Sequence, residues 1–191
     1  MRNFRIDEAS ERQPQVLVVN SEKVRLYFGH EEVEREGMDG QPYTVYVAKF
    51  VELPVSLGTD ALTLAKAAVI AEIEEYDKSE AINQFMLNGL PMWLDDATRT
   101  KLSKRFDTDE EDGKTVTKLI YENKPYILPI SAARGMLHQI ESYATACFDK
   151  TNEHIATVGA KRSVDKVLEY DYTDGYPEEK PSFTIEMQEA E

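Results

Sequence analysis

The pattern of apolar residues is most regular between Ser131 and Gly159, where it repeats with the period of an α-helix. Apolar or small residues recur there every three or four positions, which places them on one helix face. They are Ala133, Leu137, Ile140, Ala144, Cys147, Thr151, Ile155 and Val158. Ser131 follows Pro129 and can accept hydrogen bonds from the free N–H groups at the helix start, while Gly159 can adopt a left-handed conformation at the end. The sequence therefore predicts one long helix whose apolar face the rest of the chain covers.

The N-terminal part of the chain carries the β-branched and aromatic pattern of strands. A turn is predicted between the second and third strands, because Gly37, Gly40 and Pro42 favour tight turns. Residues 1–14 are polar and predict a mobile lead-in. We expect an antiparallel unit of three strands, at Gln15–Val19, Lys23–Phe28 and Tyr43–Leu53.

Helices and hairpins alternate in the next part of the chain. Asp60 can cap a helix that runs to about Tyr76. Asn88 and Gly89 then lie between two apolar arms, which is a strong short-range signal for a β-hairpin. Pro91 predicts that the second arm lies at a sheet edge or is a short strand, because proline has no N–H group to donate.

A second helix is predicted after Asp95 or Asp96, either of which can cap it. It ends near the last of its expected inner residues, which are Ala97, Leu102 and Phe106. The segment 107–114 (DTDEEDGK) then predicts a solvated acidic loop. Its alternating acids resemble a calcium-binding loop, but Asp112 stands where that loop needs glycine and Lys118 where it needs glutamate.

A second hairpin is predicted with strands at Val116–Tyr121 and Pro125–Ile130. Beyond the long helix, Ser163 can cap a short helix that contains Val164, Val167 and Leu168. These elements together predict an α+β fold, in which antiparallel hairpins pack on helices around the long helix and an N-terminal β unit precedes them.

The predicted elements divide the chain into three parts. Residues 1–58 form the N-terminal antiparallel β unit, residues 59–177 the α+β domain, and residues 178–191 an acidic tail. The first boundary rests on Pro54 and Gly58, which end the strand pattern.

The 191 residues carry a formal net charge of −14, which narrows the range of expected partners. Binding to nucleic acid needs concentrated positive charge, so no nucleic-acid partner is expected. No apolar run approaches the ~20 residues that span a bilayer, and the N-terminus lacks the apolar core of a signal peptide. Neither a membrane partner nor export is therefore expected, and one cysteine excludes an internal disulfide.

The histidines and the cysteine of the long helix make a weak case for a catalytic or metal site. His138 and Glu141 have a spacing that can share a metal, but His138 lies outside the apolar stripe. Cys147 and His154 are ~10 Å apart along the helix axis, too far to bond each other or share one metal. We expect no catalytic residue, no metal and no cofactor, and we expect Cys147 to be a small buried residue.

Four basic residues cluster on the second predicted helix, and they are Arg99, Lys101, Lys104 and Arg105. In a chain this acidic, the cluster predicts either a solvated face or an intramolecular partner for the acidic loop. Contact with nucleic acid is the disfavoured alternative.

Aromatic residues gather at two places, and both groups are expected first as core or core-edge residues. One group surrounds the first predicted hairpin and includes Trp93. The other lies in the loop-like stretch YDYTDGYP near the end of the chain. Because aromatic residues also anchor protein–protein contacts, the candidate partner-binding residues are Tyr170, Tyr172, Tyr176 and Trp93.

Five stretches of the chain carry a family resemblance. They are Tyr76–Asn83 (YDKSEAIN), Leu87–Arg99 (LNGLPMWLDDATR), the segment KPYILPI, Met136–Ala156 and Ser163–Pro177. Over about residues 76–177 the chain resembles an uncharacterised domain family of tailed phages and prophages, often encoded near tail-fibre genes. The resemblance implies a phage origin and a role in the tail region, as a virion component or an assembly factor. It implies no catalytic residues.

The leading hypothesis is a non-enzymatic phage or prophage protein that binds phage tail or tail-fibre proteins during assembly. Its expected location is the host bacterial cytoplasm during assembly, with the virion as a second location. Association with further copies of the same chain, as a homo-oligomer, is left as an open alternative. One alternative is an early phage accessory protein that binds and sequesters a host factor, with its acidic surface as a nucleic-acid mimic. Another is a tail-associated hydrolase.

Overall fold

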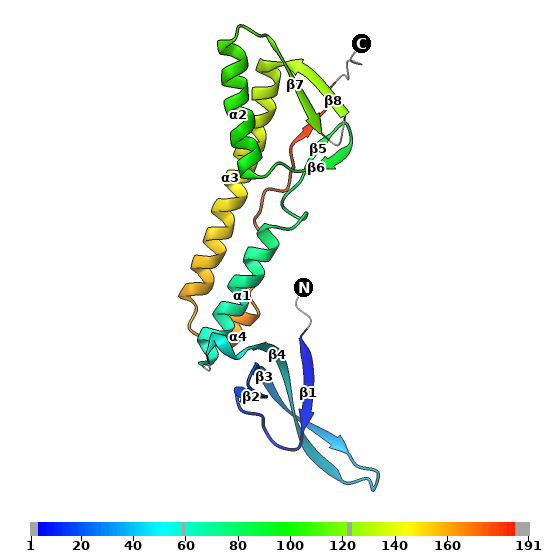
Figure 1. The fold of residues 1–191 in the computed structure, drawn as a ribbon. Helices are drawn as coiled ribbons and strands as arrows, with labels where there is room; N and C mark the ends of the chain where they lie inside the picture. The colour runs from blue at the N-terminus through cyan, green and yellow to red at the C-terminus, as the bar shows by residue number, and fades with distance from the viewer. Residues whose placement is uncertain (1–3, 59, 122–123, 186–191) are drawn as a thin grey trace. The chain divides into compact units, whose positions relative to one another are not determined.

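The structure, a computed structural model, describes residues 4–58, 60–121 and 124–185. It combines helices with antiparallel sheets around one long helix, so the predicted α+β class is confirmed. The chain forms two compact units, one of residues 1–74 with 153–172 and one of residues 75–152 with 173–191. The helices α1 (Ala61–Asp77) and α3 (Ile130–Ala160) contribute residues to both units (Figure 1). The division expected at residues 58 and 177 stays a prediction.

The first unit contains a four-stranded antiparallel sheet in which each of the three predicted strands is present. Its strands, in spatial order, are β1 (Arg5–Ala9), β4 (Pro42–Pro54), β3 (Lys23–Glu36) and β2 (Val16–Val18). The prediction of a mobile lead-in is wrong for Arg5–Ala9, because this segment pairs with β4 from Phe50 to Tyr46. The pattern of a polar edge strand does not differ from that of a polar tail until the partner strand is known.

One face of this sheet packs on helices and forms the core of the first unit. Val24, Leu26 and Phe28 of β3 are buried against α1 and against α4 (Val164–Leu168). A 3-10 turn, η1 (Val55–Leu57), follows β4. Asp60 caps α1 as predicted, since its carboxylate accepts a hydrogen bond from the Thr63 N–H group at 2.8 Å.

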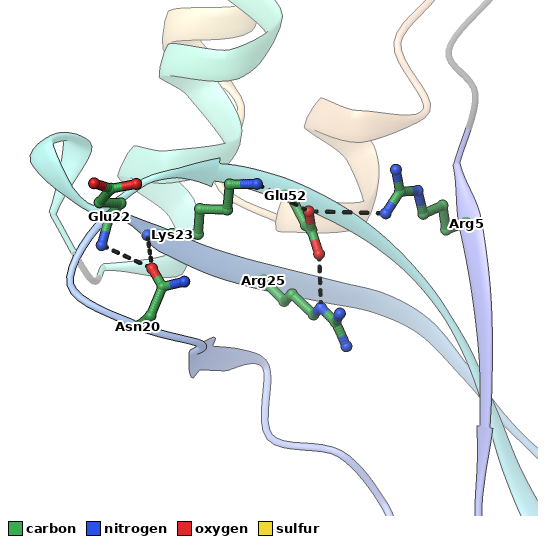
Figure 2. A network of polar contacts seen from close by, with 6 residues as sticks. All are labelled: Arg5, Asn20, Glu22, Lys23, Arg25 and Glu52. Carbon is green, nitrogen blue, oxygen red and sulfur yellow. Dashed lines mark hydrogen bonds and ion pairs between the residues drawn. The ribbon is translucent and has the colours of Figure 1, made fainter.

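The other face of the sheet carries an ion-pair network centred on Glu52 of β4 (Figure 2). Glu52 lies 3.1 Å from Arg25 Nε, 3.8 Å from Arg5 Nη1 and 4.0 Å from Lys23 Nζ. The Arg25 guanidinium also lies over the Phe50 ring, 4.7 Å from its centroid. The three cations come from β1 and β3, so the network joins three neighbouring strands at their surface. The pairs of Glu52 with Arg5 and Lys23, whose side chains are exposed, add little to stability.

The hairpin of β3 and β4 is longer than predicted and contains a bulge. The pairing register shifts between Phe28 and Glu31, where Gly29 has a φ of +59°. Beyond the bulge the strands continue to the pair of Glu36 with Pro42, whereas the sequence predicted that β3 ends at Phe28. Met38 lies fully exposed in the turn. A glycine at the bulge allows the positive φ that other residues adopt at a cost.

The second unit begins with the predicted Asn88-Gly89 hairpin, formed by β5 (Phe85–Leu87) and β6 (Leu90–Met92). Asn88 and Gly89 have φ values of +50° and +79°, as a tight hairpin turn requires. Pro91 lies on the edge strand β6, as predicted. On the other side, β5 pairs in parallel with β9 (Ser182–Phe183), a short strand within the segment predicted as a tail.

Helix α2 (Asp96–Glu111) begins as predicted but ends later. Asp95 is its cap and accepts a hydrogen bond from the Thr98 N–H group at 2.6 Å. The prediction of an acidic loop is wrong for residues 107–111, which are helical. Partners distant in sequence balance these acids, since Arg134 lies 2.7 Å from Asp107 and 2.8 Å from Glu110.

The inner side of α2 differs from the prediction at one position. Phe106 is buried and Leu102 is half-buried, as expected, but Ala97 is exposed. Arg99 is buried instead, because its guanidinium donates to the Leu94 carbonyl at 2.6 Å and to Glu141 at 2.9 Å. A helical pattern that counts only apolar residues cannot find a buried arginine.

The second predicted hairpin is present as β7 (Val116–Tyr121) and β8 (Lys124–Pro129), which form a two-stranded sheet. The predicted turn falls on residues 122 and 123, which lie outside the described residues, and on Lys124. The inner face of the hairpin packs on α2 and α3 through Tyr126, Leu128 and Phe106, which share one core with Ile140.

The predicted long helix is confirmed as α3, and its apolar stripe is buried or half-buried along its length. The predicted ending is wrong, because Gly159 lies inside the helix without a positive φ and the helix continues to Ala160. Ser131 becomes the second residue of the helix rather than its cap. Ser163 precedes α4 as expected, but its side chain makes no capping hydrogen bond.

Candidate protein-binding surface

The four aromatic residues predicted to bind a partner are divided between the two units. Tyr170 and Tyr172 border the main core of the first unit. Trp93 and Tyr176 border a small cluster around Cys147 in the second unit. All four side chains are half-buried, so none of them is a fully exposed anchor.

The hydroxyl groups of the three tyrosines are engaged within their own units. The pairs are Tyr170 with His154 Nδ1 at 2.7 Å, Tyr172 with Glu72 Oε2 at 3.3 Å, and Tyr176 with Thr151 Oγ1 at 2.9 Å. Trp93 packs edge-to-face on Tyr143, with centroids 6.5 Å apart. These contacts fix the aromatic residues at core edges. Their binding to a partner stays a prediction.

Cys147 is a core residue, as expected from its position on the stripe. Its side chain is buried beside Tyr143 and Ile82, and this burial raises the pKa of the thiol. A raised pKa keeps the sulfur protonated near neutral pH, whereas a reactive cysteine needs a thiolate. His138 is exposed, while His154 is buried against Tyr170.

Two of the four basic residues of α2, Arg99 and Arg105, make contacts within the chain. Arg99 is buried and lies over the Trp93 ring, 5.5 Å from its centroid. Arg105 lies 3.6 Å from Asp109 on the next helical turn, so one of the two predicted roles, an internal partner for the acidic segment, holds for this residue. Lys101 and Lys104 lie on the exposed side of the helix or at its edge.

Two of the exposed large apolar side chains lie on the outer face of β7. Burial alternates along the strand, so that Thr117 and Leu119 face the core and Val116 and Ile120 face outward. Val116 is 50% exposed and Ile120 is 70% exposed. Lys118 lies between them on the same face. Large apolar side chains that share one exposed face are typical of a protein-binding surface.

A cavity of about 190 Å³ lies next to this strand within the second unit. Its lining is apolar apart from a few side chains, and it includes Leu119 and Leu128 of the hairpin, Phe106 of α2 and Ile140 of α3. Ile120 also lines the cavity, although most of its side chain is exposed.

Sequence reasoning missed this surface because it treated the second hairpin only as a cover for the long helix. The available signal was the alternation in TVTKLIY, which places Val116, Lys118 and Ile120 on one face. That signal becomes decisive only when the opposite face is known to pack on α2 and α3.

No protein-family model, no curated protein and no solved structure matches the chain. The resemblance to a phage domain family therefore stays a prediction. In the described parts of the chain, no group of three histidine, cysteine, aspartate or glutamate side chains is placed to hold a metal ion. None of the described helices is both long and apolar enough to cross a membrane.

Proposed function

We propose that this chain is a non-enzymatic phage or prophage protein that acts by protein–protein contact in tail or tail-fibre assembly. The observation that carries the contact is the outer face of β7, where Val116 and Ile120 expose large apolar side chains. Such residues lose contact with water when a partner covers them, which favours association.

The phage setting of the proposal rests on the resemblance over residues 76–177. Most of the similar stretches belong to the second unit, which also carries the exposed face of β7. The segment KPYILPI contains β8, the strand paired with β7. A contact made by this hairpin would therefore use the part of the chain that is similar to the family.

The test is affinity capture of the tagged chain from bacteria that are producing phage, followed by mass spectrometry of the captured proteins. We expect tail or tail-fibre proteins in the complex. The variant Ile120→Ser should capture several-fold less of them. Its matched control is Phe148→Ser, which removes a large apolar side chain of α3 that is also exposed, to 61%.

Two results would contradict the proposal. One is the absence of the chain from virions together with the absence of tail proteins from the captured complexes. The other is a tail-protein complex that Ile120→Ser and Phe148→Ser weaken equally, which would move the contact away from β7.

A second candidate function is the sequestering of a host factor by an acidic surface. It is favoured by the distal part of the β3–β4 hairpin, where Glu31, Glu32, Glu34 and Glu36 stand against one basic residue, Arg35. Concentrated negative charge of this kind can compete with nucleic acid for a basic protein. Capture of a host nucleic-acid-binding protein that added DNA releases from the complex would favour this alternative. Expression of this chain together with the early phage genes would favour it as well.

A further inference from the structure

The free edge of β7 can be assigned from one backbone hydrogen bond and the strand register. The Ile130 N–H group donates to the Thr115 carbonyl at 3.0 Å, and Thr117 then pairs with Leu128. In an antiparallel pair, alternate residues point both backbone groups at the partner strand and the others point both away. Odd-numbered residues of β7 therefore face β8, while Val116, Lys118 and Ile120 direct their N–H and C=O groups to the opposite edge.

The two edges of the β7–β8 sheet differ in their ability to accept a further strand. On β8 the outward-pointing positions are Pro125, Ile127 and Pro129, and two of these residues have no N–H group. On β7 each outward-pointing residue keeps a donor and an acceptor. The two strands form a sheet of their own within the described chain, so prolines block one edge and β7 presents the open one.

Lys118 determines which strand the open edge can accept. Among the described residues Lys118 makes no ion pair, and it lies between the two exposed apolar residues Val116 and Ile120 on one face. If two copies of β7 paired about their centres, the two Lys118 side chains would lie opposite each other. Like charges directly opposite destabilise a sheet, whereas an opposite charge stabilises it.

We propose that β7 accepts an added strand from a partner protein, and that this strand carries an acidic residue between two apolar residues at alternate positions. The acidic side chain pairs with Lys118, and the apolar side chains pack on Val116 and Ile120. Backbone hydrogen bonds to the open edge provide affinity, and the alternating side chains provide selectivity. This inference rests on the proposed function and adds the binding site and the chemical class of its partner.

The probe is a synthetic seven-residue peptide, blocked at both ends, in which valine, glutamate and isoleucine alternate with threonines. Titration into the full chain is followed by NMR and by hydrogen exchange of the backbone amides. We expect slower exchange at Val116, Lys118 and Ile120. A control peptide with lysine in place of glutamate should bind more weakly by on the order of tenfold, and Lys118→Glu should reverse that preference.

Two proline variants separate the edge from the rest of the hairpin. Lys118→Pro removes one outward N–H group from β7, and Ile127→Pro removes one from β8; neither group belongs to the β7–β8 pairing. We expect Lys118→Pro to abolish peptide binding and Ile127→Pro to leave it unchanged. Melting temperatures of both variants establish that the fold is retained, and Lys118→Glu provides the comparison if proline unfolds the hairpin.

Several results would overturn the inference. The first is that the glutamate peptide does not bind at millimolar concentration, and the second is that both peptides bind equally. The third is that Lys118→Pro and Ile127→Pro change peptide binding equally. A dimer of the free chain that Lys118→Pro abolishes and Ile127→Pro leaves intact would assign the edge to a second copy instead. If the wild type and Lys118→Pro capture tail proteins equally, the proposed function is preserved and this site is rejected. If the wild type captures no tail protein but binds the glutamate peptide, the proposed function alone is rejected.

Discussion

The hairpins β3–β4 and β7–β8 differ in how their outer strand edges are protected from pairing with further strands. The strands β3 and β4 have 14 and 13 residues, and β2 and β1 each cover part of their outer edges. The strands β7 and β8 have six residues each and no covering strand among the described residues. An edge left open invites further pairing. The long hairpin therefore has a longer edge to protect from strand addition than the short one.

The protection of the long hairpin changes along its length. Beyond β2, the strand β3 carries four glutamates between Glu31 and Glu36, and charge of one sign resists the approach of a similar strand. The short hairpin is protected by prolines on β8 alone. The comparison teaches that one hairpin has a neighbouring strand on each side, whereas the other has prolines on one side only.

The largest effect is expected where the closed, inner face of β7–β8 meets α3. Ile140 is 2% exposed and shares a core with Tyr126 and Leu128 of β8. Ile140→Asp should lower the free energy of unfolding by about 3 kcal/mol or more, because it buries an unpaired charge. Ser142→Asp, on the exposed side of the same helix, should change it by less than about 0.5 kcal/mol. Equal melting temperatures would show that the inner face is assigned wrongly.

A smaller effect is expected where β1 covers the edge of the long hairpin. The buried Tyr27 hydroxyl of β3 donates to Asp7 Oδ2 of β1 at 2.9 Å. Tyr27→Phe leaves that carboxylate without its donor and should cost about 1–2 kcal/mol in urea unfolding. Tyr43→Phe, at a half-exposed position of β4, is the control and should be close to neutral. A neutral Tyr27→Phe would mean that this bond does not hold β1 in place.

The bulge that distinguishes β3–β4 gives a matched pair of glycine substitutions. Gly29 has a φ of +59°, so Gly29→Ala should destabilise the chain by about 1 kcal/mol. Gly135 lies in the interior of α3, with open space around the position of a Cβ atom. Gly135→Ala should therefore stabilise it by up to about 1 kcal/mol. Thermal unfolding measures both, and the same sign for both substitutions would contradict the backbone assignment.

The smallest effect concerns pH and the attachment of β7 to α2. Hydrogen bonds from Lys114 and Thr117 lower the pKa of Asp109. A lowered pKa in the folded state adds stability above the usual pKa of about 4, and this stability is lost as the pH falls through the lower, folded value. Asp109→Asn should thus destabilise the chain at neutral pH and progressively less in acid.

The control for this pH dependence is Asp112→Asn, at an exposed carboxylate 3.2 Å from Lys114. Its melting temperature should follow that of the wild type more closely at every pH. A constant gap between Asp109→Asn and the wild type from neutral to strongly acidic pH would contradict the role of the Asp109 carboxylate.

The features that depend on near neighbours could be predicted from the sequence. Asp60 and Asp95 cap their helices through the residue three positions later, and Asn88-Gly89 forms its turn alone. The features that depend on distant partners could not. The strand at Arg5–Ala9 is defined by a partner about 40 residues away, and the helical end of α2 is balanced by Arg134 of α3.

The candidate surface was hidden for a similar reason. Pro125 and Pro129 were visible in the sequence, and their even spacing alone places them on one edge. Which edge that is depends on the bond between Ile130 and Thr115, hence on how the hairpin joins the start of α3. Sequence reasoning searched for aromatic anchors, whereas this surface consists of Val116, Lys118 and Ile120.

The two prolines of β8 also set a limit on growth. Hairpins with two open edges can pair edge to edge without limit, because each added hairpin presents a new open edge to the next one. Pro125 and Pro129 make β8 a terminus, so strands can accumulate on one side of this hairpin only. Under the proposed strand addition, the sheet of each copy therefore grows on its β7 side alone, and β8 ends the sheet on the other side.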